Sequence, residues 1–265
     1  MTKPIIPWPG GKRRLVAPII STFPEHRTYV EPFCGAAAIF LAKPPARVEV
    51  LNDFNGELTN LYRVIKHHPN ELATQFRWAL NSRRMFEWAQ ATPTEILTDI
   101  QRAARFFYLQ KLAFGGKVTS QTFGYAPSSP PRLNLMRLEE DISELHLRLA
   151  TVYIEDGCWQ RCVARYDRPE TLFFCDPPYW ETAGYGTPFP WEQYIALEAF
   201  MRESQGTVIT TLNDHPAIRE LFAGYDLAPI DIQYTAAGGH KAKPAKELII
   251  RKKMPSQSKR KTVSK

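Results

Sequence analysis

The chain has 265 residues, of which 44% are hydrophobic, and it carries a formal net charge of +7. That length is enough for one large α/β domain or for one domain with an insertion. No apolar run approaches the roughly 20 residues that span a bilayer, and the amino-terminal residues lack the long apolar core of a secretory signal. The bulk properties therefore disfavour a membrane or secreted protein, and we expect a cytoplasmic one.

The positive charge attracts polyanions such as nucleic acids. Part of it lies in the tail, residues 253–265, whose lysine, arginine, proline, serine and glutamine content predicts disorder. The cysteines are typical of free thiols in a reducing compartment. No second pair of cysteines or histidines stands near the one close pair, so we expect no metal site. The cysteines are Cys34, Cys158, Cys162 and Cys175.

The first part of the chain alternates strand and helix patterns. Residues 28–32 predict a strand, residues 36–41 a helix, and residues 47–51 a second strand that ends at Asn52-Asp53. A βαβ unit of this kind is the building block of a doubly wound sheet.

Between residues 56 and 150 the pattern changes, because apolar residues recur at helical spacing and no strand pattern is present. A long irregular stretch, residues 115–132, interrupts these helices and carries Phe123 and Tyr125 among basic and hydroxyl side chains. Such a mixture is typical of a nucleic-acid surface. An ordinary surface loop is the alternative interpretation.

Strand and helix patterns alternate again after residue 150. We therefore expect a Rossmann-like α/β fold with helices on both faces of the sheet, made of residues 1–55 and 151–252 and split by a helical insertion, residues 56–150. The expected strands are 150–154, 171–175, 207–212 and a final antiparallel pair, 231–235 and 247–251; the expected helices are 191–201 and 216–222.

The most informative motif is Asp176-Pro-Pro-Tyr179, which directly follows the apolar strand 171–175. Neither proline has an N–H to donate, so the strand ladder stops and nearby carbonyl groups are left to accept hydrogen bonds. Open α/β sheets bind ligands at the carboxyl ends of their strands. An acid, carbonyl groups and an aromatic ring at that edge suit a flat base whose amino group must become nucleophilic.

Two further motifs indicate a nucleoside site. Trp8-Pro-Gly-Gly-Lys12 offers a flat ring, a cation and two glycines that allow close backbone approach; a simple turn is the alternative. Glu31-Pro-Phe-Cys-Gly35 is a strand-to-helix turn without the full glycine-rich phosphate pattern, which fits a ligand that has no phosphate. Asp53, after the next strand, can accept hydrogen bonds from ribose hydroxyls or cap the following helix.

In this order, the motifs Trp8-Pro-Gly-Gly-Lys12, Val30-Glu-Pro-Phe-Cys-Gly35, Asn52-Asp-Phe-Asn55 and Asp176-Pro-Pro-Tyr179 resemble the Dam-type family of DNA adenine methyltransferases. The resemblance implies an S-adenosylmethionine-dependent methyltransferase that modifies N6 of an adenine flipped out of a specific sequence in double-stranded DNA. It implies catalytic roles for Asp176, Pro177, Pro178 and Tyr179, and cofactor contacts for Trp8, Gly10, Gly11, Lys12, Glu31, Phe33, Gly35, Asp53 and Asp176.

The chemistry of the amino group agrees with these implied roles. The N6 lone pair is delocalised into the adenine ring, and two hydrogen-bond acceptors return it to nitrogen. The Asp176 carboxylate and the Pro177 carbonyl can be these acceptors, the first of them charge-assisted. Tyr179 can stack on the base, which is worth roughly 1–3 kcal/mol. The methyl group is already activated on a sulfonium, so no metal is required, and alignment can lower the barrier by roughly 7–11 kcal/mol.

The chain departs from the family in two places. The insertion stands where the family has its target-recognition region, but Leu112-Ala-Phe-Gly-Gly-Lys117 lacks the Asn-Gly and the nearby arginine of members that read GATC, so no recognition sequence is predicted. Ala36-Ala-Ala38 stands where a second glycine is usual. The catalytic motif alone also permits an RNA or other amino-group methyltransferase, or a catalytically dead DNA-binding relative.

The resemblance also implies partners. We expect Lys117, Arg132, Lys241 and Lys243 to face DNA phosphates. We expect a monomer or a weak dimer in a cytoplasm of prokaryotic type, including that of a phage host. Such an enzyme acts alone or beside a cognate restriction endonuclease.

Overall fold

The computed structural model of the chain describes residues 2–125, 130–182, 186, 188–234 and 243–253, without the side chains of residues 232–234 and 243–245. Its strands form one seven-stranded sheet in the order β3-β2-β1-β4-β5-β7-β6. The strands are β1 (Thr28–Glu31), β2 (Val48–Asp53), β3 (Tyr153–Asp156), β4 (Thr171–Cys175), β5 (Thr207–Asn213), β6 (Asp226–Tyr234) and β7 (Lys243–Arg251).

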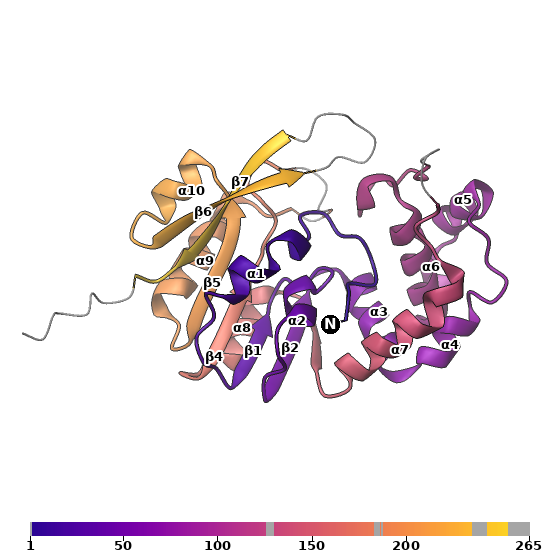
Figure 1. Cartoon of the computed structure of the whole chain (residues 1–265), viewed down its shortest axis with the longest axis horizontal. Coiled ribbons are helices and arrows are strands. Elements are labelled where there is room, and N and C mark those ends of the chain that lie inside the picture. Colours follow the sequence, from indigo (N-terminus) through magenta and orange to yellow (C-terminus); the bar gives the residue numbers. More distant parts are fainter. Residues whose placement is uncertain (1, 126–129, 183–185, 187, 235–242, 254–265) are drawn as a thin grey trace, which may run out of the picture.

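The direction of the strands locates a crevice. Strands β1 to β5 run parallel, and β7 runs antiparallel to both of its neighbours, β5 and β6. The chain goes outward from β1 to β2 and β3, and then returns to β4 on the other side of β1 (Figure 1). The pair β1 and β4 is therefore the topological switch point, and ligands bind at the carboxyl ends of the strands there.

Both faces of the sheet are buried, as expected for a doubly wound fold. In β4, Leu172 and Phe174 pack in one apolar cluster, and Phe173 and Cys175 pack in the other, because successive residues of a strand point to opposite faces. The helices of the first cluster next to the sheet are α1 (Val16–Ile20), α2 (Ala38–Ala42) and α3 (Gly56–His67); those of the second are α8 (Trp159–Tyr166), α9 (Trp191–Glu203) and α10 (Pro216–Leu221).

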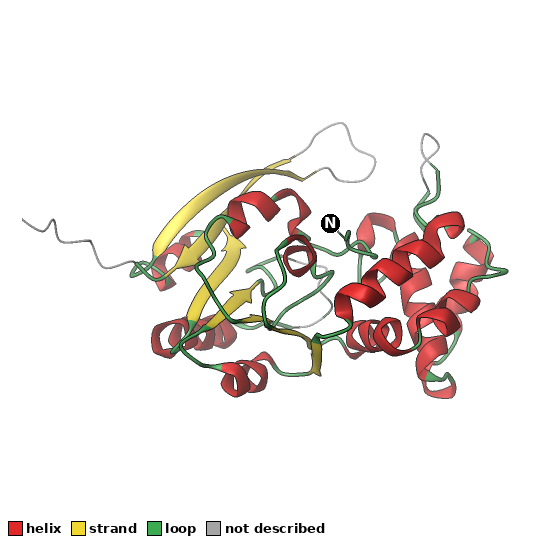
Figure 2. Cartoon of the chain, turned by 60° about the horizontal axis from the view of Figure 1, so that its bottom comes forward, coloured by secondary structure: helices red, strands yellow, loops and turns green. Residues whose placement is uncertain are grey.

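Residues 56–150 are helical, as their pattern predicted, and extended pairing in the described part of this segment is limited to one bridge between Ala113 and Phe123. The helices lie beside the sheet, on the side away from β6 and β7 (Figures 1 and 2). One apolar cluster runs from the sheet through α3 into α6 and α7, so the insertion shares its core with the sheet. After α3 come α4 (Pro69–Thr74), α5 (Arg83–Ala91), α6 (Asp99–Leu112) and α7 (Leu138–Leu149).

Local signals explain where these helices begin. The side chain of Asn55 accepts hydrogen bonds from the backbone N–H groups of Glu57 and Leu58 and so caps α3. At α6, Thr98 and Gln101 form a reciprocal capping box. In the described part of the chain, we find no helix with the length and apolar character that crossing a membrane requires.

The structure corrects the predicted elements in two places. The strand predicted at 150–154 begins only at Tyr153, because α7 continues to Leu149 and a turn follows it. Helix α8 was not predicted, although its buried residues Trp159, Cys162 and Val163 have helical spacing. The final antiparallel pair is confirmed, and each of its strands spans nine residues, more than the sequence indicated.

The described part of the predicted long loop is held against α5. The Phe123 ring lies 5.7 Å from that of Phe86, and the guanidinium of Arg83 lies 5.1 Å from the Phe123 ring centroid. Gln90 Nε2 donates a hydrogen bond of 2.8 Å to the carbonyl of Gln121. The segment that ends at Phe123 is therefore held in the insertion both by these side-chain contacts and by the backbone pairing with Ala113.

Candidate active site

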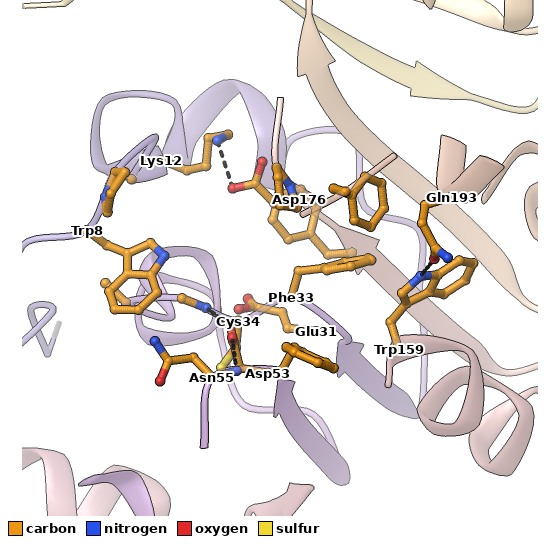
Figure 3. Close-up of a pocket in the computed structure, with 18 of the residues that line it drawn as sticks. Trp8, Lys12, Glu31, Phe33, Cys34, Asp53, Asn55, Trp159, Asp176 and Gln193 are labelled. Atoms are coloured by element: carbon orange, nitrogen blue, oxygen red, sulfur yellow. Dashed lines mark hydrogen bonds and ion pairs between the residues drawn. The ribbon is translucent and has the colours of Figure 1, made fainter. Parts of the chain in front are cut away.

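A cavity of about 290 Å³ lies at the carboxyl ends of β1 to β4, where the switch point predicts a ligand (Figure 3). The segments after these four strands and the Trp8–Lys12 segment contribute to its walls, so motifs far apart in the sequence meet here. Of the predicted site residues, the lining includes Trp8, Gly11, Lys12, Glu31, Phe33, Gly35, Asp53, Asp176 and Pro178.

The buried Lys12 and the partly exposed Asp176 form an ion pair at one end of the cavity. Lys12 Nζ lies 2.7 Å from Asp176 Oδ2 and donates a second hydrogen bond, of 2.6 Å, to the Gly10 carbonyl. The hydroxyl of Thr211 donates to the other carboxylate oxygen at 2.7 Å. Burial raises the pKa of Asp176 to about 6, although the Lys12 charge acts in the opposite direction. The carboxylate is thus held at both oxygens and is ionised at neutral pH.

The corner after Asp176 is held by side chains from α9 and β5. The Pro178 carbonyl accepts a hydrogen bond of 2.6 Å from the Tyr194 hydroxyl. The Asn213 side chain accepts a hydrogen bond of 3.0 Å from the Trp180 N–H and donates one of 3.1 Å to the Trp180 carbonyl. No described residue donates to the Pro177 carbonyl, so this carbonyl retains its capacity to accept.

Three predicted site residues do not line the cavity. Gly10 contributes its carbonyl to Lys12, and Pro177 is buried in the corner. Tyr179 is 7% exposed, with its ring centroid 4.7 Å from the Lys12 ammonium. Stacking of Tyr179 on a base would require a rearrangement around this ring, and that role stays a prediction.

The loop after β1 depends on close contact with Trp8. Gly35 has a φ of 47°, and a Cβ atom there would lie only 2.7 Å from Cδ1 of the Trp8 indole. Glycine is therefore required at this position, both for its backbone conformation and for the approach of the ring. Ala37, in the Ala36–Ala38 segment that departs from the expected glycine pattern, also has a left-handed backbone, with a φ of 53°. The Tyr62 hydroxyl fixes the loop by donating a hydrogen bond of 2.8 Å to the Gly35 carbonyl.

Asp53 lies at the end of β2, facing this loop. Its carboxylate accepts hydrogen bonds of 2.9 Å from the backbone N–H groups of Gly35 and Asn55. Burial raises the pKa of Asp53, and these two hydrogen bonds act against the rise. A carboxylate has about four lone-pair positions, so Asp53 retains capacity to accept a further hydrogen bond. Asn55, not Asp53, caps α3, which removes the alternative interpretation of Asp53 as the helix cap.

Glu31 is buried at the end of β1. One of its oxygens accepts from the Tyr29 hydroxyl at 2.5 Å and from the Phe40 N–H at 2.7 Å. Burial raises the pKa of Glu31 to about 8, so the group is mostly protonated at neutral pH. Glu31 therefore adds an oxygen to the cavity wall but little negative charge.

The opposite wall is aromatic, and most of it was not predicted. Phe33 lies 5.7 Å from both Trp159 and Phe189, measured between ring centroids. The Trp159 indole N–H and the Gln160 amide both donate to Gln193 Oε1 at 2.8 Å. Trp159 follows β3 at the carboxyl edge of the sheet, and this position could have indicated the aromatic wall. The strand was predicted too early, at residues 150–154, so Trp159 was not recognised as a residue of that edge.

The charged groups of the lining define the class of ligand. Among the described residues, they are the carboxylates of Asp53 and Asp176 and one cation, Lys12, which is already paired; the Glu31 carboxyl adds little charge. A phosphate would find no available cation among them, whereas a nucleoside that carries a positive charge would find compatible surroundings. The described residues contain no cluster of histidine, cysteine or acidic side chains that could hold a metal ion.

The basic residues predicted to contact DNA are described only in part. Lys117 and Arg132 are exposed, on the connection between α6 and α7. Lys241 lies outside the described residues. Lys243 begins β7, but its side chain lies outside the described side chains.

Similar sequences agree with the geometry. A sequence model of the D12 class N6 adenine-specific DNA methyltransferase family matches residues 8–236. Type II methyltransferase M1.LlaDCHI of Lactococcus lactis subsp. cremoris is 28% identical to this chain, over 88% of this chain and 89% of its own length. Type II methyltransferase M.CviBI of Paramecium bursaria Chlorella virus NC1A is 27% identical, over 84% of this chain and 87% of its own length. The DNA adenine methylase of Haemophilus influenzae is 26% identical, over 93% and 92%.

These matches confirm the resemblance that the four ordered motifs indicated. They favour an adenine-specific DNA methyltransferase over an enzyme that acts on other amino groups. The protein belongs to the D12 class N6 adenine-specific DNA methyltransferases.

Proposed function

We propose that the cavity binds S-adenosylmethionine and that the Asp176 corner prepares N6 of a flipped-out adenine for methylation. The observation that carries this proposal is the meeting of Asp53, the Trp8–Lys12 segment and Asp176 around one cavity at the switch point. The bound cofactor supplies a methyl group that is already activated on a sulfonium.

The residues of the cavity suit this cofactor. Asp53 has acceptor positions left for ribose hydroxyls, and the rings of Phe33, Trp159 and Phe189 offer flat apolar faces for a base. The Asp176 carboxylate favours a cation such as the sulfonium. Gly35 lets the Trp8 indole pack directly on the backbone beside Asp53.

In the proposed reaction, the Asp176 carboxylate and the Pro177 carbonyl accept hydrogen bonds from the N6 amino group and increase its nucleophilicity. As N6 gains the methyl group it would become more acidic, and Asp176 would accept its proton. A pKa of about 6 lets Asp176 accept this proton and release it to solvent near neutral pH. Holding the reacting atoms in line supplies most of the remaining acceleration.

A base inside a duplex cannot reach this corner, so the adenine must leave the helix at a cost of a few kcal/mol. We propose that Tyr179 stacks on the extruded base once DNA binding uncovers its ring. Residues 56–150 would act as the target-recognition region, with Lys117 and Arg132 contacting phosphates. A cytoplasmic location is in keeping with the four free cysteines. A monomer or weak dimer, with or without a cognate restriction endonuclease, is the proposed working state.

The test uses S-adenosylmethionine with a labelled methyl group, offered with unmethylated duplex DNA or with RNA. We expect label in N6-methyladenine of DNA and none in RNA. Asp176→Ala should abolish incorporation, whereas Asp226→Ala, at a half-exposed ion pair with Arg251 on the β6–β7 hairpin, should retain it. Label in RNA alone would refute DNA as the substrate, and full activity of Asp176→Ala would refute the proposed role of Asp176.

A further inference from the structure

A second buried carboxylate lies behind Asp176. Glu247 on β7 is 1% exposed, and its Oε2 lies 3.9 Å from Lys12 Nζ. Because Asp176 Oδ2 lies 2.7 Å from the same nitrogen, the ammonium is placed between two carboxylates. Glu247 is not part of the cavity lining, so its effect on the reaction must pass through Lys12 and Asp176.

The position of Glu247 is set by the sheet. It stands opposite Asn213 in the β5–β7 pairing. Asn213 holds the backbone of Trp180, and Thr211, two residues earlier on β5, donates to Asp176. Two adjacent strands thus support the catalytic corner, β5 by hydrogen bonds and β7 by the charge of Glu247.

The groups of this cluster act on one another through their charges. Asp176 at 2.7 Å and Glu247 at 3.9 Å lie near the same ammonium, in a region where burial strengthens electrostatic interactions. The Lys12 charge lowers the pKa of Asp176 and the Glu247 charge raises it, both on top of the rise due to burial. Among the described residues, the titratable groups that act on Asp176 or on Lys12 beside it include Lys12, Glu31, Cys175, Tyr179 and Glu247.

We propose that Glu247 is a positioning residue for methyl transfer, which holds the Lys12 ammonium against Asp176 and, by its charge, sets the pH at which Asp176 becomes an acceptor. This inference rests on the proposed role of Asp176. The inference gives the Glu247 side chain two separate functions. The position of its carboxylate holds Lys12, and its charge acts on Asp176.

Glu247→Gln removes the charge and keeps the shape. We expect the acid limb of the kcat/KM profile to move to lower pH. The same shift should occur without cofactor or DNA, in a ¹³C NMR titration of the Asp176 carboxyl, assigned by its loss in Asp176→Asn. Glu220→Gln, an equal charge change on the exposed face of α10, should leave both curves in place. A folded Glu247→Gln protein with an unchanged Asp176 titration would overturn the inference.

Glu247→Asp keeps the charge and withdraws the carboxylate by one methylene. We expect the acid limb to stay in place while kcat at pH 8 falls about 10-fold, with the KM for DNA unchanged, because Lys12 is less well placed. A kcat equal to that of the wild type would overturn the positioning role. If the Glu247→Gln protein does not fold, Glu247→Asp still provides this test. Wild-type protein that transfers no methyl group would instead refute the proposed function, and the NMR titration would still test Glu247.

Discussion

The two walls of the cavity differ in how they are built. The polar wall, with Lys12, Asp53 and Asp176, comes from short local motifs, in which two glycines precede Lys12 and two prolines follow Asp176. The aromatic wall, with Trp159 and Phe189, comes from segments that only the packing of the sheet brings together. The polar wall should therefore control chemistry and ligand class, and the aromatic wall should mainly add affinity.

Removing the charge of Asp53 should give the largest effect on cofactor binding. Asp53→Asn keeps the size of the side chain but removes the charge that would strengthen its proposed hydrogen bonds to ribose hydroxyls. Hydrogen bonds to charged groups are worth about 1.5–3 kcal/mol, so the Kd for S-adenosylmethionine should rise about 10- to 100-fold, measured by calorimetry. Asp156→Asn, at the end of the adjacent strand β3 and outside the lining, should change the Kd little. Equal effects of the two variants would remove Asp53 from the site.

This contrast also explains what the sequence predicted. The strands were found because they are short apolar runs, and the polar wall because its motifs are local. Helix α8 and the aromatic wall were missed, since Trp159 and Gln193 meet only when α8 and α9 pack on the same face of the sheet. The second carboxylate at Lys12 was missed for the same reason: Glu247 lies far along the chain, and only the β5–β7 pairing brings it to the corner.

A change of pH should act on activity and stability in opposite directions. Burial raises the pKa of Asp176 to about 6 and that of Glu31 to about 8, so the folded protein binds these protons more tightly than the unfolded chain. Their contribution to stability is complete below their unfolded pKa values, near 4, and is lost as the pH rises through about 6 and about 8. In the proposed reaction, activity needs ionised Asp176 and should fall about 10-fold per pH unit below 6.

Thermal unfolding of the wild-type protein and of Asp176→Asn from about pH 4 to about pH 7 measures the contribution of Asp176. The wild-type protein should lose stability relative to the variant as the pH rises from about 4 to about 6. Parallel curves would mean that the carboxyl is not perturbed by folding, and the proposed proton acceptor would lose its physical basis.

The aromatic wall should respond more weakly to substitution. Trp159→Leu removes a flat face and the donor to Gln193 but keeps an apolar residue in the core. Since aromatic pairing is worth about 0.5–1.5 kcal/mol beyond burial, the Kd for S-adenosylmethionine should rise about 2- to 10-fold, with kcat at saturation unchanged. Trp88→Leu, on the exposed side of α5, should bind as the wild type does. A large loss of kcat in Trp159→Leu would show that this wall orients the reacting groups as well.

The smallest effect is expected at Ala37, in the loop of the polar wall. Ala37→Gly relieves a left-handed backbone worth about 1–2 kcal/mol, but it removes a methyl group that is 99% buried, worth about 0.8 kcal/mol, and adds freedom to the unfolded chain. These terms nearly cancel, so the melting temperature and the cofactor Kd should hardly change. Gly35→Ala makes the reverse exchange two residues away and should destabilise the protein clearly, because its Cβ would meet the Trp8 indole. If both variants were neutral, contact with Trp8 would not be what requires glycine at position 35, and the tolerance of alanine at position 37 would need another explanation.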